Sequence, residues 1–204
     1  RQALPGVGPA RPHLVTGDGD AGPVMNRAGY DRIAGRWDHS RGPLRPQELA
    51  LLDLALARST VGDRVLDLGC GTGWPIGAML LERGLVLTGV DQSTGMLAIA
   101  RARMPAATLV AARIEEYVPD AGLAAIICWD ALFHVPRAHH PALLRRWSDA
   151  LRPGGRLLLT SGGSAHAAFV DTMFDIPFFY DAWPPEALDD LAAEAGLVSV
   201  QRTW

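Results

Sequence analysis

Apolar residues in this chain follow two different spacings, and the changes of spacing divide it into strands and helices. Short apolar runs predict strands at residues 65–68, 85–90, 108–111, 124–129, 156–161 and 197–203. Apolar residues three or four positions apart predict helices at residues 28–41, 45–58, 75–83, 94–103, 140–151 and 185–195. Because the two kinds alternate after residue 65, we expect an α/β fold with a doubly wound, mainly parallel sheet and helices on both faces.

The first 24 residues do not share this pattern. They are rich in Gly, Pro, Ala and Arg and include the run GDGDAG, which favours a flexible N-terminal extension over a packed element. We expect residues 25–204 to form one domain. A chain of 204 residues with a hydrophobic fraction of 49% has enough material for one core but little for two.

Composition and charge narrow the classes of partner and compartment. The net charge of −3 argues against a protein that tracks a nucleic-acid backbone, because such proteins are usually basic. No apolar run reaches the ~18 residues of a membrane span, so we expect no membrane contact. The two cysteines, Cys70 and Cys128, are far apart in sequence, which favours a reducing, cytoplasmic compartment over a metal site or a disulfide framework.

The stretch VLDLGCGTGWP, residues 65–75, combines a strand, three alternating glycines and the start of a helix. Such a loop lets a ligand approach the backbone at a helix N-terminus. The dinucleotide fingerprint requires a glycine where Trp74 stands, and the phosphate-binding P-loop requires a lysine, a residue type that the chain lacks. Asp91 ends the next strand, where an acid can accept hydrogen bonds from both ribose hydroxyls. Together these residues predict a site for a nucleoside without a pyrophosphate.

Four stretches then reveal a resemblance: VLDLGCGTG, VDQSTGML, CWDALFHVP and LRPGGRLLLTSG. In their order and spacing they resemble the class I S-adenosylmethionine (SAM)-dependent methyltransferases, from about Tyr30 to the last predicted strand. The YDRIAGRW and FHVP segments are similar to small bacterial enzymes of this family that act on small molecules. The resemblance implies a Rossmann-like fold, SAM as cofactor and S-adenosylhomocysteine (SAH) as product.

The resemblance also implies cofactor-binding roles at matching positions. Asp67 and the backbone of Gly69, Cys70 and Gly71 would hold the methionine end of SAM, and Gly73 would belong to the same cofactor-binding loop. Asp91 would bind the ribose, Gln92 and Met96 would flank the adenine, Arg113 and Ile114 would offer backbone contacts, and Trp129 would border the sulfonium. Other roles remain open for three of them: Asp67 as a residue that only pins the loop, Asp91 as a helix cap, and Met96 as a core residue.

His134 and Tyr30 are the candidate catalytic residues. His134 follows the fourth strand of the alternating pattern, and its ordinary pKa suits a general base. Tyr30 lies on the first helix, which closes over the cofactor in the family that the chain resembles. Trp37 shares the helix face of Tyr30 and is a candidate for substrate binding. Two alternatives stay open, a loop or capping role for His134 and an ordinary buried helix face for Tyr30 and Trp37.

The aromatic stretch FVDTMFDIPFFYDAWPP, residues 169–185, predicts a lid over an apolar acceptor pocket. We expect Phe178 and Tyr180 of this stretch to bind the substrate together with Phe133 on the opposite side. The alternatives are that these aromatic residues cover a sheet edge or bind a second subunit.

The resulting hypothesis is a SAM-dependent methyltransferase that acts on an oxygen or nitrogen atom of a small, partly apolar molecule. One alternative is a SAM-binding protein without transferase activity. Another is a macromolecule methyltransferase, which the acidic balance and the WDAL segment oppose. We expect no metal, because His139 and His140 are adjacent and would point apart on a helix.

The predicted C-terminus differs from the pattern of the family. The family's sheet ends with an additional antiparallel strand, whereas this sequence stops after the predicted strand at residues 197–203. If that last strand is missing, the sheet has a free edge that could pair with a second copy, so a homo-oligomer is expected in that case. The identity of the acceptor remains open.

Overall fold

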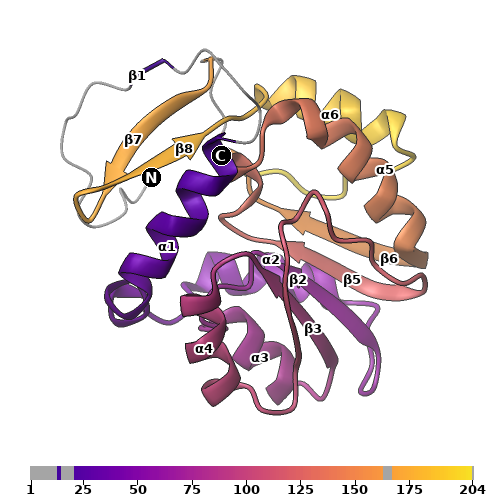
Figure 1. Ribbon diagram of the computed structural model, residues 1–204. Coiled ribbons are helices and arrows are strands. Elements are labelled where there is room, and N and C mark those ends of the chain that lie inside the picture. Colours follow the sequence, from indigo (N-terminus) through magenta and orange to yellow (C-terminus); the bar gives the residue numbers. More distant parts are fainter. Residues whose placement is uncertain (1–12, 15–20, 163–166, 204) are drawn as a thin grey trace.

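The computed structural model describes residues 13–14, 21–162 and 167–203, and its centre is a parallel sheet of five strands (Figure 1). The strand order is β4-β3-β2-β5-β6, and every neighbouring pair is parallel. The strands are β2 (Arg64–Leu68), β3 (Val86–Asp91), β4 (Thr108–Ala111), β5 (Leu123–Cys128) and β6 (Leu151–Leu159). The order reverses direction between β2 and β5, so the carboxyl ends of these two strands flank the crevice where ligands of such sheets bind.

Alternating residues of the central strands enter two cores on opposite faces of this sheet. Leu66 and Ile126 pack on one face with α5 (His140–Ala150) and α6 (Pro185–Glu194). Val65 and Ile127 pack on the other face with α2 (Pro46–Leu56) and α3 (Ile76–Glu82). Both faces of the central strands are therefore covered, as expected for continuous apolar strands in a parallel sheet.

Helix α1 (Ala21–Ser40) lies between the large sheet and a small sheet of strands β1, β7 and β8 (Figure 1). Strands β7 (Phe169–Met173) and β8 (Ile176–Tyr180) form an antiparallel hairpin, and β1 (His13–Leu14) pairs with β7. A third core joins these parts, with Ile33 and Trp37 of α1, Phe178 of β8 and Met96 of α4 (Thr94–Arg103). Helix α1 is thus held between two layers.

Salt bridges and hydrogen bonds fasten α1 to α4 at both ends of α4. The Asp31 carboxylate accepts hydrogen bonds from the Ser93 hydroxyl at 2.7 Å and from the Gly95 N–H at 2.9 Å, so α1 supplies an acid to the N-terminus of α4. Near the other end, Arg103 forms a bidentate ion pair with Asp38 at 2.7 and 3.0 Å. These contacts fix α1 beside the loop that carries Asp91.

The α/β prediction is confirmed, and most elements lie where the sequence predicts them. The predicted strand at residues 197–203 is wrong, because the structure describes these residues as an irregular segment after α6. Most of them are exposed, so they lack the burial against a neighbouring strand that would order a short apolar run. Helix α1 begins at Ala21, seven positions before the predicted start at residue 28.

Two further expectations concern segments at the margins of the described chain. Within the predicted extension, residues 1–12 and 15–20 lie outside the described residues, whereas Ala21–Val24 belong to α1. The stretch at residues 169–185 contains the hairpin β7–β8, which packs against α1.

Among the described residues, no helix combines the length and the apolar character that crossing a bilayer requires.

Candidate active site

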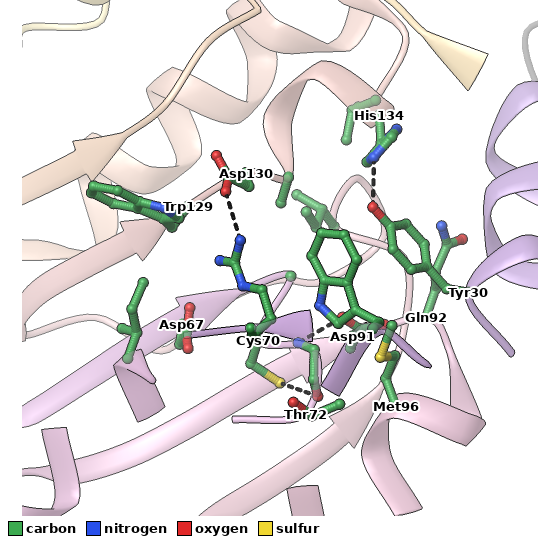
Figure 2. A pocket seen from close by; sticks show the side chains of 18 of the residues that line it. Tyr30, Asp67, Cys70, Thr72, Asp91, Gln92, Met96, Trp129, Asp130 and His134 are labelled. Atoms are coloured by element: carbon green, nitrogen blue, oxygen red, sulfur yellow. Dashed lines mark hydrogen bonds and ion pairs between the residues drawn. The ribbon is translucent and has the colours of Figure 1, made fainter. Parts of the chain in front are cut away.

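A pocket opens at the carboxyl ends of the central strands, under helix α1. Its lining comes from the loops after β2, β3, β4 and β5 and from the inner face of α1. The lining includes Pro23, Tyr30, Trp37, Arg41, Asp67, Gly69, Cys70, Gly71, Asp91, Gln92, Met96, Ile114, Trp129, Asp130, Ala131, His134 and Val135. Figure 2 shows the side chains of Asp67, Asp91, Tyr30 and His134 within this one space.

The glycine loop after β2 is hydrogen-bonded to the last two residues of strand β3. The N–H groups of Gly69 and Cys70 both donate to the Val90 carbonyl, at 2.8 and 3.0 Å, and the Gly71 N–H donates to the Asp91 carboxylate at 2.9 Å. Three loop N–H groups therefore bond Val90 and Asp91. These two residues pin this part of the loop, and a pinning role for Asp67 stays a prediction.

Glycine is required at two positions of this loop for different reasons. At Gly69, where φ is +74°, a Cβ atom would lie 2.4 Å from the Cβ of Ala131, so the neighbouring loop leaves no room for a side chain. At Gly71, where φ is +54°, the nearest atom to an added Cβ is Trp37 Nε1 at 4.0 Å. A side chain at Gly71 would therefore begin to fill the gap between the loop and Trp37, and without one the loop backbone itself lines the pocket.

Two carboxyl groups, those of the buried Asp67 and the partly buried Asp91, line the pocket. Burial and, as a smaller cause, the nearby Asp91 carboxylate together raise the pKa of Asp67 to about 7. Burial also raises the pKa of Asp91 to about 6, although the N–H groups of Ser93 and Gly71 oppose this rise. The cap of helix α4 is Ser93, whose hydroxyl accepts from the Met96 N–H at 3.1 Å, so capping is not the role of Asp91.

Tyr30 and His134 form a hydrogen-bonded pair at the opposite side of the pocket (Figure 2). The Tyr30 hydroxyl lies 2.8 Å from His134 Nε2, and His134 Nδ1 lies 2.8 Å from the Phe179 carbonyl oxygen. Since a carbonyl only accepts, Nδ1 carries the proton, and Nε2 of the neutral ring accepts from Tyr30. Burial lowers the pKa of His134 to about 4 and raises that of Tyr30 well above its usual value. Both side chains are therefore neutral at pH 7.

The charged residues at the mouth of the pocket are paired. Arg41 forms an ion pair with Asp130 at 3.3 Å, and its guanidinium lies over the Trp37 ring, 5.0 Å from the ring centroid. Asp130 has a φ of +51°, and its N–H donates to the Thr160 hydroxyl at 2.6 Å. This conformation, uncommon outside glycine, turns the chain from β5 into the loop that carries His134.

The structure brings most of the predicted site residues together. Those that line the pocket are Tyr30, Trp37, Asp67, Gly69, Cys70, Gly71, Asp91, Gln92, Met96, Ile114, Trp129 and His134. Gly73 lies outside this lining, and a Cβ there would meet Met104 at 2.3 Å, so it permits close packing on α4. The Arg113 side chain is paired with Glu115 at 2.6 Å.

The three predicted aromatic substrate contacts, Phe133, Phe178 and Tyr180, are not among the lining residues of this pocket. Phe178 is 0% exposed, and its ring packs against that of Tyr30 with 4.8 Å between the ring centroids. The Tyr180 ring stacks on the rings of Phe133 and Phe169, with 5.9 and 5.3 Å between the ring centroids. Helix α1 therefore covers the pocket and the hairpin supports α1. A direct substrate contact by these aromatic residues stays a prediction.

Sequence reasoning missed two residues on the first turns of α1, Pro23 and Asn26. Pro23 lines the pocket and Asn26 is fully buried. Both lie beside the Gly- and Pro-rich start of the chain, where the apolar spacing that indicates a helix is absent. A helical signal could not have been read there, because the helix is stabilised by packing on the hairpin.

Among the described residues, no three His, Cys, Asp or Glu side chains cluster as metal ligands would.

The sequence is similar to known methyltransferases. Residues 65–155 match the model of a methyltransferase domain. The chain is 34% identical over 133 residues to a malonyl-[acyl-carrier protein] O-methyltransferase of Serratia marcescens, covering 65% of this chain and 50% of that protein. It is 30% identical over 150 residues to a ubiquinone biosynthesis O-methyltransferase of Xanthomonas oryzae pv. oryzae, covering 69% and 62%. The chain thus spans about half the length of the first relative.

The fold is shared with solved structures at lower sequence identity. A 1,6-didemethyltoxoflavin-N1-methyltransferase of Burkholderia thailandensis, solved with its namesake ligand and SAH, matches with a TM-score of 0.67 and 20% identity. The match covers 91% of this chain and 88% of that one. The domain match over the strands and loops that build the pocket, together with this shared fold, leads to one conclusion: residues 65–155 form a methyltransferase domain, in a chain with the fold of SAM-dependent methyltransferases.

Proposed function

We propose that this protein transfers the methyl group of SAM to an oxygen or nitrogen atom of a small, partly apolar acceptor. One observation carries the proposal: a single pocket holds the glycine loop and Asp91 on one side and the Tyr30–His134 pair on the other. The relatives named above are O-methyltransferases, and the solved N-methyltransferase shares the fold, which supports both kinds of acceptor atom.

The residues of the pocket fit SAM. Asp91 offers carboxylate oxygens for the ribose hydroxyls, while Met96 and Ile114 offer buried apolar surface for the adenine. The backbone of the glycine loop lines the pocket at Gly69 and Gly71, and it would lie against the amino-acid part of the cofactor. When bound, SAM supplies a methyl group on a positively charged sulfur, a leaving group that needs no further activation. The carboxyl groups of Asp67 and Asp91 suit that positive charge.

The Tyr30–His134 pair would orient the acceptor and take its proton. The Tyr30 oxygen has lone pairs left after donating to His134 Nε2, so it can accept a hydrogen bond from a hydroxyl or an amine. With its lowered pKa, His134 is too weak a base to ionise a resting hydroxyl. A hydroxyl becomes strongly acidic as it gains a methyl group, however, and its proton can then pass through Tyr30 to Nε2.

The charges around the pocket favour an acceptor without negative charge. Pro23, Trp37, Ala131 and Val135 are neutral residues in the lining near the Tyr30–His134 pair. In the part of the chain that the structure describes, Arg41 is the one cationic side chain of the lining, and it is paired with Asp130. An anionic acceptor would have to break this pair to find a countercharge, which disfavours carboxylates and phosphates.

Two measurements test this proposal in sequence. Isothermal titration calorimetry with SAH should show binding, and absence of binding would refute the cofactor assignment. A screen of small phenols, amines and carboxylates with methyl-labelled SAM should then show methyl uptake by neutral phenols or amines. Binding of SAH without any uptake would favour a SAM-binding protein that does not act as a transferase.

We also retain two proposals about the protein in its cell. A cytoplasmic location is supported by Cys70 and Cys128, which are buried free thiols. A homo-oligomer is supported by the outer edge of β6, because β6 is the last strand in the order of the large sheet. Light scattering coupled to size exclusion would detect the oligomer, and a monodisperse monomer would refute it.

A further inference from the structure

The buried side chain of Asn26 clamps the main chain of Phe179. Asn26 is 0% exposed; its Oδ1 accepts from the Phe179 N–H at 2.7 Å, and its Nδ2 donates to the Phe179 carbonyl at 3.0 Å. The amide orientation is unambiguous, because a backbone N–H only donates and a carbonyl only accepts. Nδ2 also lies 3.4 Å from the His134 carbonyl oxygen. One side chain of α1 thus contacts both β8 and the loop that carries His134.

The Phe179 carbonyl that Asn26 holds is also the partner of His134. His134 Nδ1 donates to this oxygen at 2.8 Å, so the oxygen accepts from Asn26 and from His134 together. The position of the carbonyl decides which nitrogen of the ring carries the proton. It also decides where Nε2 points, because the ring is hydrogen-bonded at both nitrogens.

Asn26 and Tyr30 reach His134 from one face of the same helix. They are four positions apart, so their side chains lie one turn apart on α1. Two glycines allow the helix to come this close to β8. A Cβ at Gly22 would lie 2.5 Å from the Phe179 ring, and a Cβ at Gly29 would lie 2.7 Å from the Phe178 ring. The approach of α1 to β8 brings the Asn26 amide within reach of the Phe179 main chain.

We propose that Asn26 is a positioning residue of the active site, which fixes the tautomer and the orientation of His134 by holding the Phe179 carbonyl. Tyr30 meets the Nε2 side of the ring, and Asn26 controls the Nδ1 side through Phe179. This inference rests on the proposed function, since the Tyr30–His134 pair would handle the acceptor there. It goes beyond it by assigning a role to a residue that touches neither pocket nor ligand.

Substitution of Asn26 by aspartate separates positioning from simple packing. Asn26→Asp keeps the shape and the acceptor for the Phe179 N–H. Burial raises the pKa of a carboxyl group, so the spectra are recorded at pH 8 or above, where the ionised side chain lacks the donor to the carbonyl and adds a buried negative charge. The titratable groups that face His134 are Tyr30 of α1 and Tyr180 of β8, and nearby Asp181 is already paired with Arg137. The new carboxylate would therefore act on His134 directly.

The decisive readout is the NMR spectrum of the His134 ring in ¹⁵N-histidine-labelled protein. In the wild type we expect one neutral tautomer with the proton on Nδ1. In Asn26→Asp we expect mixed tautomers or a pKa of His134 raised by about one pH unit or more. His134 signals identical to those of the wild type in a folded Asn26→Asp variant would overturn the proposal. Asn26→Ser, which keeps one hydroxyl, replaces it if the aspartate variant does not fold.

The matched control is Arg36→Ala on the same helix. Arg36 donates to the Phe174 carbonyl at 3.3 Å, so it ties α1 to the turn of the same hairpin without touching Phe179 or His134. Both variants should lower the melting temperature, but only the Asn26 variant should change the His134 signals. Equal changes in both would assign Asn26 a merely structural role. The spectra need no acceptor, so they give an answer even if SAH titration contradicts the proposed function.

Discussion

The Tyr30 hydroxyl donates a hydrogen bond to His134 Nε2 at 2.8 Å, across 104 positions of sequence. The two residues come from α1 and from the short 3₁₀ helix at Leu132–His134, and their rings lie 5.4 Å apart in an edge-to-face arrangement. Burial keeps both side chains neutral at pH 7. The pair is therefore uncharged. The Tyr30 oxygen donates to His134 and keeps lone pairs that can accept a hydrogen bond from another group.

Removal of the Tyr30 hydroxyl should impair turnover more than cofactor binding. Tyr30→Phe keeps the ring packed on Phe178 but leaves His134 Nε2 without its donor. We expect kcat to fall about 100-fold, in the range typical of lost proton transfer, while the SAH affinity changes little. Turnover is measured with the acceptor found in the methyl-uptake screen. Tyr117→Phe, outside the pocket lining, is the control, and equal losses in both variants would contradict the role of Tyr30.

A methyl group at Gly71 should block the pocket. Gly71→Ala would project its side chain toward Trp37 Nε1, into the space kept free for a ligand. We expect SAH binding to be lost, and the left-handed backbone to lower the free energy of unfolding by about 1–2 kcal/mol. Gly35→Ala is the matched control, because nothing lies within 4 Å of its Cβ; it should bind SAH normally and raise stability by about 0.5–1 kcal/mol. Undiminished binding by Gly71→Ala would place the cofactor elsewhere.

Loss of the charge on Asp91 should weaken cofactor binding. Asn can still accept from one of the N–H groups of Gly71 and Ser93, so the loop should keep its course. Each hydrogen bond to a charged group contributes about 1.5–3 kcal/mol, so Asp91→Asn should weaken SAH binding about 10- to 100-fold by calorimetry. Asp53→Asn, at an exposed aspartate paired with Arg83, should leave the affinity unchanged. Equal affinities in both variants would remove Asp91 from the site.

Cofactor affinity should rise with pH between about pH 5 and pH 8. In the free protein, burial holds the pKa of Asp67 at about 7 and that of Asp91 at about 6, above their ordinary value of 3.8. Donors on the ligand favour the ionised carboxylates, so binding lowers both pKa values and releases protons. The affinity should increase by up to about tenfold per pH unit for each proton released, and level off above both pKa values.

Titrations of SAH in buffers of different ionisation enthalpy would count these protons, and an affinity independent of pH would contradict the assignment. The same shifts affect stability. Because the folded state holds protons that the unfolded state releases, the two carboxyl groups lose stabilising free energy as pH rises through 6 and 7. Asp67→Asn should therefore stabilise the unliganded protein more at pH 8 than at pH 5.

The sequence predicts the cofactor side of the molecule well because local patterns encode it. The apolar runs at β2 and β5 are buried on both faces, and the glycine at position 69 after β2 follows from the close approach of Ala131. Asp91 could be placed in the site from its position at a strand end alone. The rule that ligands bind at the carboxyl ends of parallel strands then unites these loops without any knowledge of distances.

The side of the pocket that faces the acceptor could not be predicted in the same way. The start of α1 has no helical apolar pattern, since its Gly22 and Asn26 are selected by contact with β8 and not by helix propensity. The sequence predicts that Phe178 contacts a substrate, but aromatic residues in a hairpin look the same in sequence whether they line a pocket or support a helix. Only the tertiary pairing of α1 with β8 distinguishes these two roles.

The interlocking of α1 with the hairpin has a consequence for protein engineering. The methyltransferase domain match ends at residue 155 and begins at residue 65, so α1 and the hairpin lie outside it on either side. Yet Gly22 and Asn26 of α1 both pack directly against Phe179 of the hairpin. A chimaera that takes only one of the two segments from a relative would have mismatched contacts between α1 and the hairpin. Exchange of residues 21–40 and 167–180 as a set is the graft that would keep these contacts intact while it changes the acceptor side of the pocket.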